Sequence, residues 1–176
     1  SMTEAPVVRV ARLPRMRLAY FEAQLAADAV EEADELWQRL TQWQQQAQPR
    51  VGRIDIRALG WILEADAGAA RVTYRAGVPL RSDGEAPAPA RTTLFPGGAF
   101  AYCHAGDVGE MDDAFAAVRW AIDEQGYSTR SGPIEVYLYH FNVDQHPAEC
   151  GFLVGNADGT DLLASRGHEG PLPIGR

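Results

Sequence analysis

The chain has 176 residues, 46% of them hydrophobic, which is typical of one globular domain with its own core. Its 24 acidic residues outnumber 16 basic ones, all of them arginine, for a formal net charge of -8. This balance argues against nucleic acid as the main partner, because phosphate binding requires a dense basic face. It leaves room for a cationic ligand. No apolar run is long enough to span a membrane and no signal-peptide pattern is present, so a cytoplasmic protein is expected.

The first part of the chain predicts the order strand, helix, strand, strand. Alternating apolar residues indicate the strands, and apolar residues at every third or fourth position indicate the helix. Asp28 and Glu31 have the spacing of a helix cap, and Pro49 stops the helical pattern. The predicted segments are strands at 7–13, 17–23, 59–63 and 71–74, with a helix running from the cap to about residue 48.

A proline-rich stretch at 81–91 predicts an extended, poorly packed linker, after which the same order of elements returns. Asp107 and Glu110 repeat the cap spacing, and Gly126 ends the second helix near Gln125. The predicted strands of this part are 92–95, 99–104, 134–140 and 150–154. Residues 156–176 contain four glycines and two prolines and are expected to form a loose C-terminal tail.

Sequence identities support an internal repeat. Pro14, Ala19 and Tyr20 recur 82 positions later as Pro96, Ala101 and Tyr102. We therefore expect an α+β fold made of a tandem pseudo-twofold βαββ repeat, with a concave antiparallel sheet and helices on one face. The expected parts are an N-terminal extension or tag at 1–6, a domain at 7–155 with halves 7–80 and 92–155, and the tail. A ligand groove is expected at the junction of the halves.

The most informative segment for function is the predicted strand at 134–140. Glu135, Tyr137 and Tyr139 alternate along it and would point to one face. If this face is exposed, the three residues are ordinary surface chemistry. If it lines the groove, the carboxylate needs a partner, and a carboxylate among aromatic rings suits a lipophilic cation. The sequence alone leaves both interpretations open.

Several segments of the chain, in order, resemble the GyrI-like effector-binding family, whose domain is also the drug-sensing part of AraC-type and MerR-type multidrug regulators. The resemblance covers roughly residues 7–155 and implies the duplicated βαββ fold. The segments are Val8 to Pro14, Leu18 to Tyr20, Trp37 with Leu40, Phe95 to Ala101, His104 to Gly106, and Pro133 to Tyr137.

The resemblance also implies a site. The glutamate at the centre of the family's pocket matches Glu135, and the aromatic residue two positions later matches Tyr137. Family members line the cleft with further aromatic residues, for which Trp61, Tyr20 and Tyr102 are the candidates here. Some stand-alone members resemble hydrolases that open cyclopropane rings in DNA-alkylating natural products, whereas others sequester toxic compounds or act on gyrase.

Three functions follow as expectations. The first is a stand-alone protein that captures bulky apolar, cationic or aromatic compounds in a cleft centred on Glu135. The second is a cyclopropanoid hydrolase in which Glu135 activates water as general base and Tyr137 assists the leaving oxygen. The third is a protein-interaction role such as gyrase modulation. No cofactor or metal is expected, nor direct DNA binding, and the protein is expected to be a monomer or homodimer.

Overall fold

The computed structural model describes residues 6–26, 30–50, 52, 55–63, 70–81, 83–139, 147–166 and 169–171. The chain forms two compact units. Unit 1 takes Ser1–Pro14, Gly97–Glu135 and His140–Arg176, whereas unit 2 takes Arg15–Pro96 and Val136–Tyr139. The predicted cap at Asp28 lies outside the described residues.

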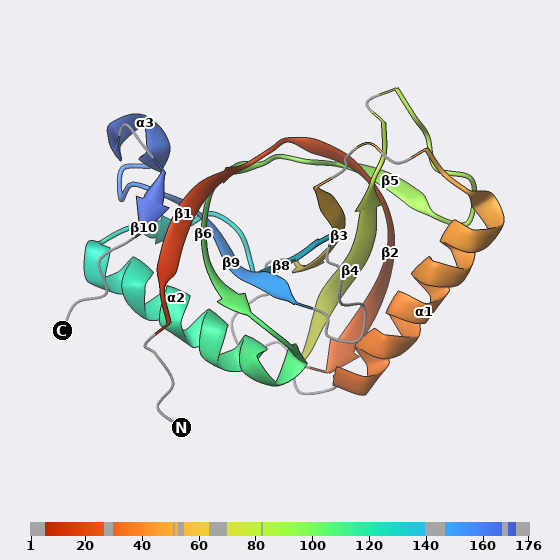
Figure 1. Cartoon of the computed structure of the whole chain (residues 1–176), viewed down its shortest axis with the longest axis horizontal. Helices are drawn as coiled ribbons and strands as arrows, with labels where there is room; N and C mark the ends of the chain where they lie inside the picture. Colours follow the sequence, from red (N-terminus) through yellow and green to blue (C-terminus); the bar gives the residue numbers. More distant parts are fainter. Residues whose placement is uncertain are drawn as a thin grey trace. The chain divides into compact units, whose positions relative to one another are not determined.

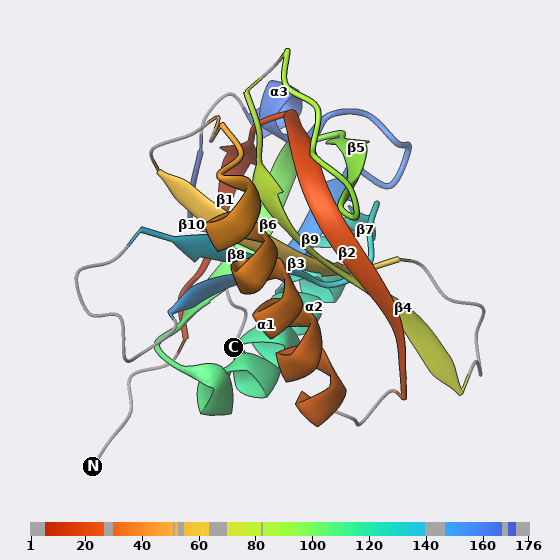
Figure 2. The same cartoon turned by 90° about the vertical axis from the view of Figure 1, so that its right-hand side faces the viewer.

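Unit 2 is built from antiparallel strands and one long helix (Figure 2). The strand order is β3-β4-β2-β5. Its elements are β2 (Met16–Ala26), α1 (Val30–Ala47), β3 (Ile56–Ile62), β4 (Arg71–Pro79) and β5 (Arg91–Phe95). The end of β8 (Ile134–Leu138) also belongs to this unit, from residue 136 onward.

Helix α1 covers one face of unit 2 and leaves the other face to different side chains. Phe21 of β2 meets Trp43 of α1 edge-on with ring centroids 6.0 Å apart. Trp37 of α1 donates a hydrogen bond through Nε1 to Tyr74 Oη at 3.0 Å. Since successive strand residues point to opposite faces, Tyr20 and Glu22 lie on the face away from α1.

Unit 1 has the same plan, with helix α2 lying along strands β6 and β9 (Figure 1). The strand order is β10-β1-β6-β9, and β7 pairs with β9. Its elements are β1 (Val8–Leu13), β6 (Gly98–Ala105), a 3₁₀ turn at Val108–Glu110, α2 (Met111–Gln125), β7 (Ser128–Thr129), the start of β8, β9 (Ala148–Gly155), α3 (Leu162–Arg166) and β10 (Gly170–Pro171).

The predicted C-terminal end of the second helix is confirmed, whereas the predicted cap lies on the 3₁₀ turn that precedes the helix. The Asp107 carboxylate accepts a hydrogen bond from the Glu110 backbone N–H at 3.2 Å, as a cap requires. Gly126 ends α2 in the left-handed conformation with φ 70, which glycine adopts without steric cost.

The α+β class and the repeated order of elements are confirmed, and strand pairing extends the repeat. Tyr20 lies opposite Gly77 on one side and Arg91 on the other. Tyr102 lies in the same way opposite Gly151 and Arg9. The first strand of each sequence half is exchanged, because β1 pairs with β6 in unit 1 and β5 pairs with β2 in unit 2. The compact units therefore differ from the sequence halves 7–80 and 92–155 at their first strands.

The stretch at 81–91 is packed more closely than the sequence predicts. Trp43 donates from Nε1 to the Pro87 carbonyl at 3.0 Å, and Arg17 donates from Nε to the Gly84 carbonyl at 2.7 Å. Two side chains of unit 2 therefore hold this connection in place.

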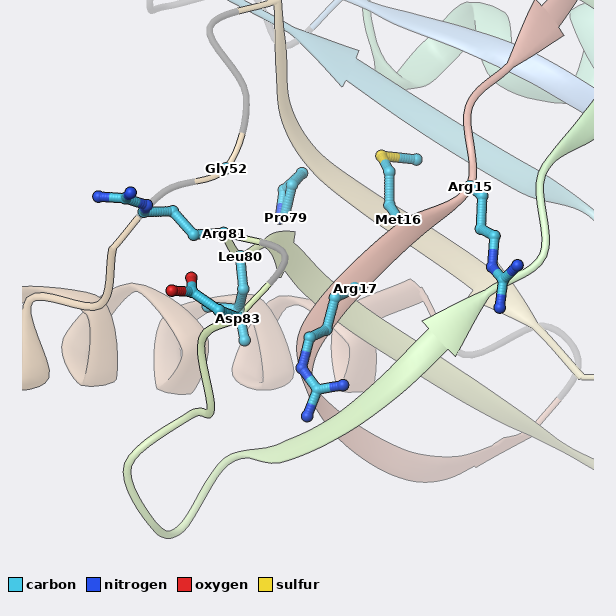
Figure 3. A pocket seen from close by; sticks show the side chains of 8 residues that line it. All are labelled: Arg15, Met16, Arg17, Gly52, Pro79, Leu80, Arg81 and Asp83. Carbon is cyan, nitrogen blue, oxygen red and sulfur yellow. The ribbon is translucent and has the colours of Figure 1, made fainter.

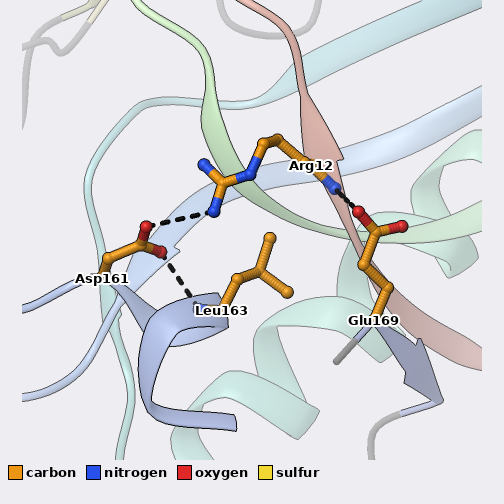
Figure 4. A network of polar contacts seen from close by, with 4 residues as sticks. All are labelled: Arg12, Asp161, Leu163 and Glu169. Atoms are coloured by element: carbon orange, nitrogen blue, oxygen red, sulfur yellow. Dashed lines mark hydrogen bonds and ion pairs between the residues drawn. The ribbon is translucent and has the colours of Figure 1, made fainter. Parts of the chain in front are cut away.

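The prediction of a loose tail from residue 156 is wrong for the described residues. Helix α3 buries Leu162 to 1% exposure, and β10 pairs with β1. Arg12 of β1 binds both parts, since its guanidinium lies 3.1 Å from the Asp161 carboxylate and its backbone N–H donates to Glu169 (Figure 4). The burial of Leu162 and the contacts of Arg12 order this segment, although its glycine content predicts a loose one.

Replacing Arg12 by alanine is expected to loosen this C-terminal segment without unfolding the protein. The Arg12 guanidinium holds the pKa of Asp161 below its ordinary value, so their pairing stabilises the segment above the usual carboxyl range and is lost as the pH falls through the lowered pKa. Hydrogen exchange at neutral pH should show a few-fold faster exchange for the α3 amides, as an exposed ion pair allows. Arg15→Ala is the control, and equal exchange in the two variants would contradict the assignment.

Candidate functional site

The face of unit 2 away from α1 carries a cluster of aromatic rings. Trp61 lies at its centre, with ring centroids 6.1 Å from Tyr20 and 5.8 Å from Phe95. Trp61 is 5% exposed and Tyr20 is 7% exposed, so both rings are packed in the described structure. The structure thus brings together Tyr20 and Trp61, two of the residues that the sequence analysis singled out.

A cation of the chain itself joins this cluster. The Arg75 guanidinium carbon lies 4.3 Å from the centroid of the Tyr20 ring, and its Nε donates to Glu22 Oε1 at 2.8 Å. Both side chains of the ion pair are largely buried, at 20% and 30% exposure. Sequence reasoning did not single out Arg75 or Glu22, because a charged residue on a strand is usually solvated.

The three residues of the late strand have different surroundings. Glu135 is half-buried at the start of β8. Burial raises the pKa of the Cys150 thiol, and the Glu135 carboxylate raises it further, so this carboxylate acts on a buried neighbour in unit 1. Tyr137 is buried and meets Trp37 of α1 edge-on, with centroids 5.2 Å apart. Tyr139 follows the end of β8 and is half exposed.

Unit 1 carries its own aromatic pair on the face away from α2. Tyr102 stacks on Phe100 with centroids 5.4 Å apart and an interplanar angle of 14°. Burial raises the pKa of Tyr102, and the Glu149 carboxylate raises it further. Burial also raises the pKa of Glu149 itself. Glu149 was missed in the sequence, although it lies 74 positions after Arg75, the spacing that also relates Gly77 to Gly151.

A cavity of about 460 Å³ opens elsewhere in unit 2 (Figure 3). It is lined by Arg15, Met16, Arg17, Gly52, Pro79, Leu80, Arg81 and Asp83. The guanidinium groups of Arg15 and Arg81 point away from each other, and that of Arg17 is already bound to the Gly84 carbonyl. Three arginines against one aspartate disfavour a cationic ligand here, and no residue singled out in the sequence lines this cavity.

Metal and membrane features can be stated only for the described parts of the chain. There, no three residues of the kinds His, Cys, Asp or Glu lie close enough together to hold a metal ion. His104 is described and exposed, whereas His140, His146 and His168 lie outside the described residues. Among the helices that the structure describes, none is long and apolar enough to cross a membrane.

Each of the two α+β units carries aromatic rings on the face away from its helix. A scan against protein-family models matches residues 6–150 to the GyrI-like small-molecule-binding domain, and the chain belongs to this family. A search of curated proteins finds no match.

Four solved structures are similar to this chain in fold. The C-terminal domain of EcmrR is 11% identical with a TM-score of 0.72, over 87% of this chain and 99% of that domain. The EcmrR chain in the EcmrR–DNA complex is 10% identical with a TM-score of 0.70. The match covers 85% of this chain and 57% of that chain. SAV2435 bound to tetraphenylphosphonium is 16% identical with a TM-score of 0.62, covering 84% and 93% of the two chains. A hydrolase from Listeria innocua is 10% identical with a TM-score of 0.50, covering 84% and 91%.

Proposed function

We propose that this protein captures bulky apolar cations at a site centred on the Glu135 carboxylate. Glu135 is half-buried on a strand, and its carboxylate raises the pKa of the buried Cys150 thiol. A carboxylate attracts a cation, and a lipophilic cation can supply its charge without a large desolvation cost.

The aromatic residues supply the second part of this recognition. Tyr102 in unit 1 offers a stacked, half-buried ring, and Tyr20 and Trp61 in unit 2 remain predicted ligand contacts. Aromatic faces attract cations, most strongly where water is excluded. Tyr137 and Tyr139 are proposed as further contacts, of which Tyr137 packs against α1 on the face of unit 2 opposite to Tyr20 and Trp61. SAV2435, similar in fold, binds tetraphenylphosphonium, a cation of this chemical class.

The observation that carries the proposal is the Tyr20–Arg75–Glu22 contact, because it demonstrates the chemistry within the chain. There a ring and a carboxylate together hold a largely buried cation. Glu135 and the aromatic residues named above are proposed to hold a ligand in the same way.

Glu135→Gln is expected to bind tetraphenylphosphonium at least about tenfold more weakly, since losing about 1.4 kcal/mol of charge pairing corresponds to that factor. Isothermal titration calorimetry measures the affinity, and circular dichroism checks the fold. Glu124→Gln, on the exposed side of α2, changes the net charge equally and should bind like the wild type. Tetraphenylborate, an anion of the same shape, should not bind. Equal affinity in Glu135→Gln and the wild type would refute the proposal.

A hydrolase using Glu135 as general base is the second candidate, supported by the fold similarity to a hydrolase. Incubation with a cyclopropane-bearing alkylator, followed by mass spectrometry, distinguishes the two functions. Multiple turnovers that disappear in Glu135→Gln would favour the hydrolase, whereas stoichiometric binding would favour capture.

A further inference from the structure

The Arg75 side chain occupies a defined place among the residues on the open face of unit 2. Strand register puts Arg75 directly between Glu22 of β2 and Trp61 of β3. Gly77 lies next along the same face, opposite Tyr20. A Cβ at Gly77 would lie 3.2 Å from Tyr20 Cβ and 3.3 Å from the Trp61 ring. The Tyr20 and Trp61 side chains therefore pack directly against this glycine.

A cation–π contact and an ion pair hold the Arg75 guanidinium in place, and the same two interactions bind cationic ligands. The Tyr20 ring lies 4.3 Å below the guanidinium carbon, within the range of a cation–π contact. Glu22 neutralises the charge through a hydrogen bond of 2.8 Å. Trp61 packs against Tyr20 and lies opposite Arg75 in the strand register, so the cation lies against one ring and one carboxylate, with a second ring beside the first.

The repeat shows that the sheet itself does not require an arginine at this position. In unit 1, Glu149 stands at the position equivalent to Arg75, and His104 stands at the position equivalent to Glu22. Tyr102 is kept at the position of Tyr20. The tyrosine and glycine are thus common to both units, whereas the cation is particular to unit 2.

We propose that Tyr20, Trp61 and Glu22 form a cation-binding subsite that the chain's own Arg75 fills. The inference rests on the proposed capture of cations. It adds that Arg75 prevents a ligand cation from binding to the ring that Arg75 already covers. While Arg75 is in place, Tyr20 and Trp61 offer a ligand apolar surface only. The unfilled subsite accepts cations of guanidinium or small quaternary ammonium size.

Chemical rescue of Arg75→Ala tests this subsite directly. The variant removes the guanidinium and leaves Glu22 largely buried beside the ring, so it is expected to melt at a lower temperature than the wild type. Millimolar methylguanidinium or tetramethylammonium should raise the melting temperature of Arg75→Ala by several degrees and change its tryptophan fluorescence, with saturation. The wild type should show neither effect.

Two further variants make the result specific. Arg39 lies 5.1 Å from the Phe21 ring on the helix-covered side, so Arg39→Ala loses a cation–π contact elsewhere in the same unit and should not be rescued. Adding Glu22→Gln to Arg75→Ala should abolish the rescue. Absence of saturable rescue in folded Arg75→Ala, or equal stabilisation of the wild type, would overturn the inference. Rescue should persist in a Glu135→Gln background, so failure of this subsite and failure of the Glu135 site are distinguishable.

Discussion

Replacing Gly151 by alanine is expected to destabilise the protein by about 3 kcal/mol or more, which is at the upper end for a single added methyl group. The new Cβ would lie 1.8 Å from the Ala101 carbonyl oxygen and 2.8 Å from the Tyr102 Cα. Both atoms belong to the backbone of β6, the strand paired with β9 at this position, so neither can move without breaking the pairing. Urea unfolding followed by circular dichroism measures the loss.

Gly77→Ala in unit 2 is the matched variant, because Gly77 holds the equivalent place beside Tyr20. Its Cβ would lie 2.7 Å from the Ala19 carbonyl oxygen, a less severe clash. A loss of about 1–3 kcal/mol is therefore expected for Gly77→Ala. An unfolding midpoint of Gly151→Ala equal to that of the wild type, or above that of Gly77→Ala, would contradict the close approach of β9 and β6.

Local patterns predicted the elements well because alternation and helical spacing act over a few residues. The helix Met111–Gln125 ends where Gly126 predicts, and the strand at Val8–Leu13 begins within one residue of its expected start. The sequence did not predict the exchange of β1 and β5, because long-range packing decides which distant strands pair with each other. The C-terminal segment was misjudged for the same reason, because the burial of Leu162 depends on a surface formed by other parts of the chain.

The sequence predicted the orientation of single strand residues of the candidate site, but it did not predict contacts between distant segments. Tyr20 and Phe21 are neighbours on one strand, so strand alternation predicts that their rings point to opposite faces, and Phe21 does pack against α1. The contact of Tyr137 with Trp37 was not predicted, because it joins a strand to a helix 100 residues earlier in the chain. Arg75 and Glu149 carry no local signal, and their roles become visible only when the strand registers of the two units are compared.

Trp61→Ala is expected to lower the free energy of unfolding by about 3–5 kcal/mol, the usual loss for truncating a packed tryptophan. Trp61 is 5% exposed, and its ring contacts both Tyr20 and Phe95, so alanine would leave a cavity between these two rings. Trp61→Phe keeps an aromatic ring and should lose less than half as much. Chemical denaturation of both variants checks these values.

The phenylalanine variant also separates the structural role of Trp61 from its proposed role in binding. Because Trp61→Phe should remain folded, its affinity for tetraphenylphosphonium can be measured by calorimetry. A phenyl ring offers a ligand less apolar surface than indole does, so binding should weaken by a few-fold if Trp61 contacts the ligand. Wild-type affinity in folded Trp61→Phe would assign Trp61 to the core alone, whereas a wild-type unfolding midpoint in Trp61→Ala would contradict the packing around it.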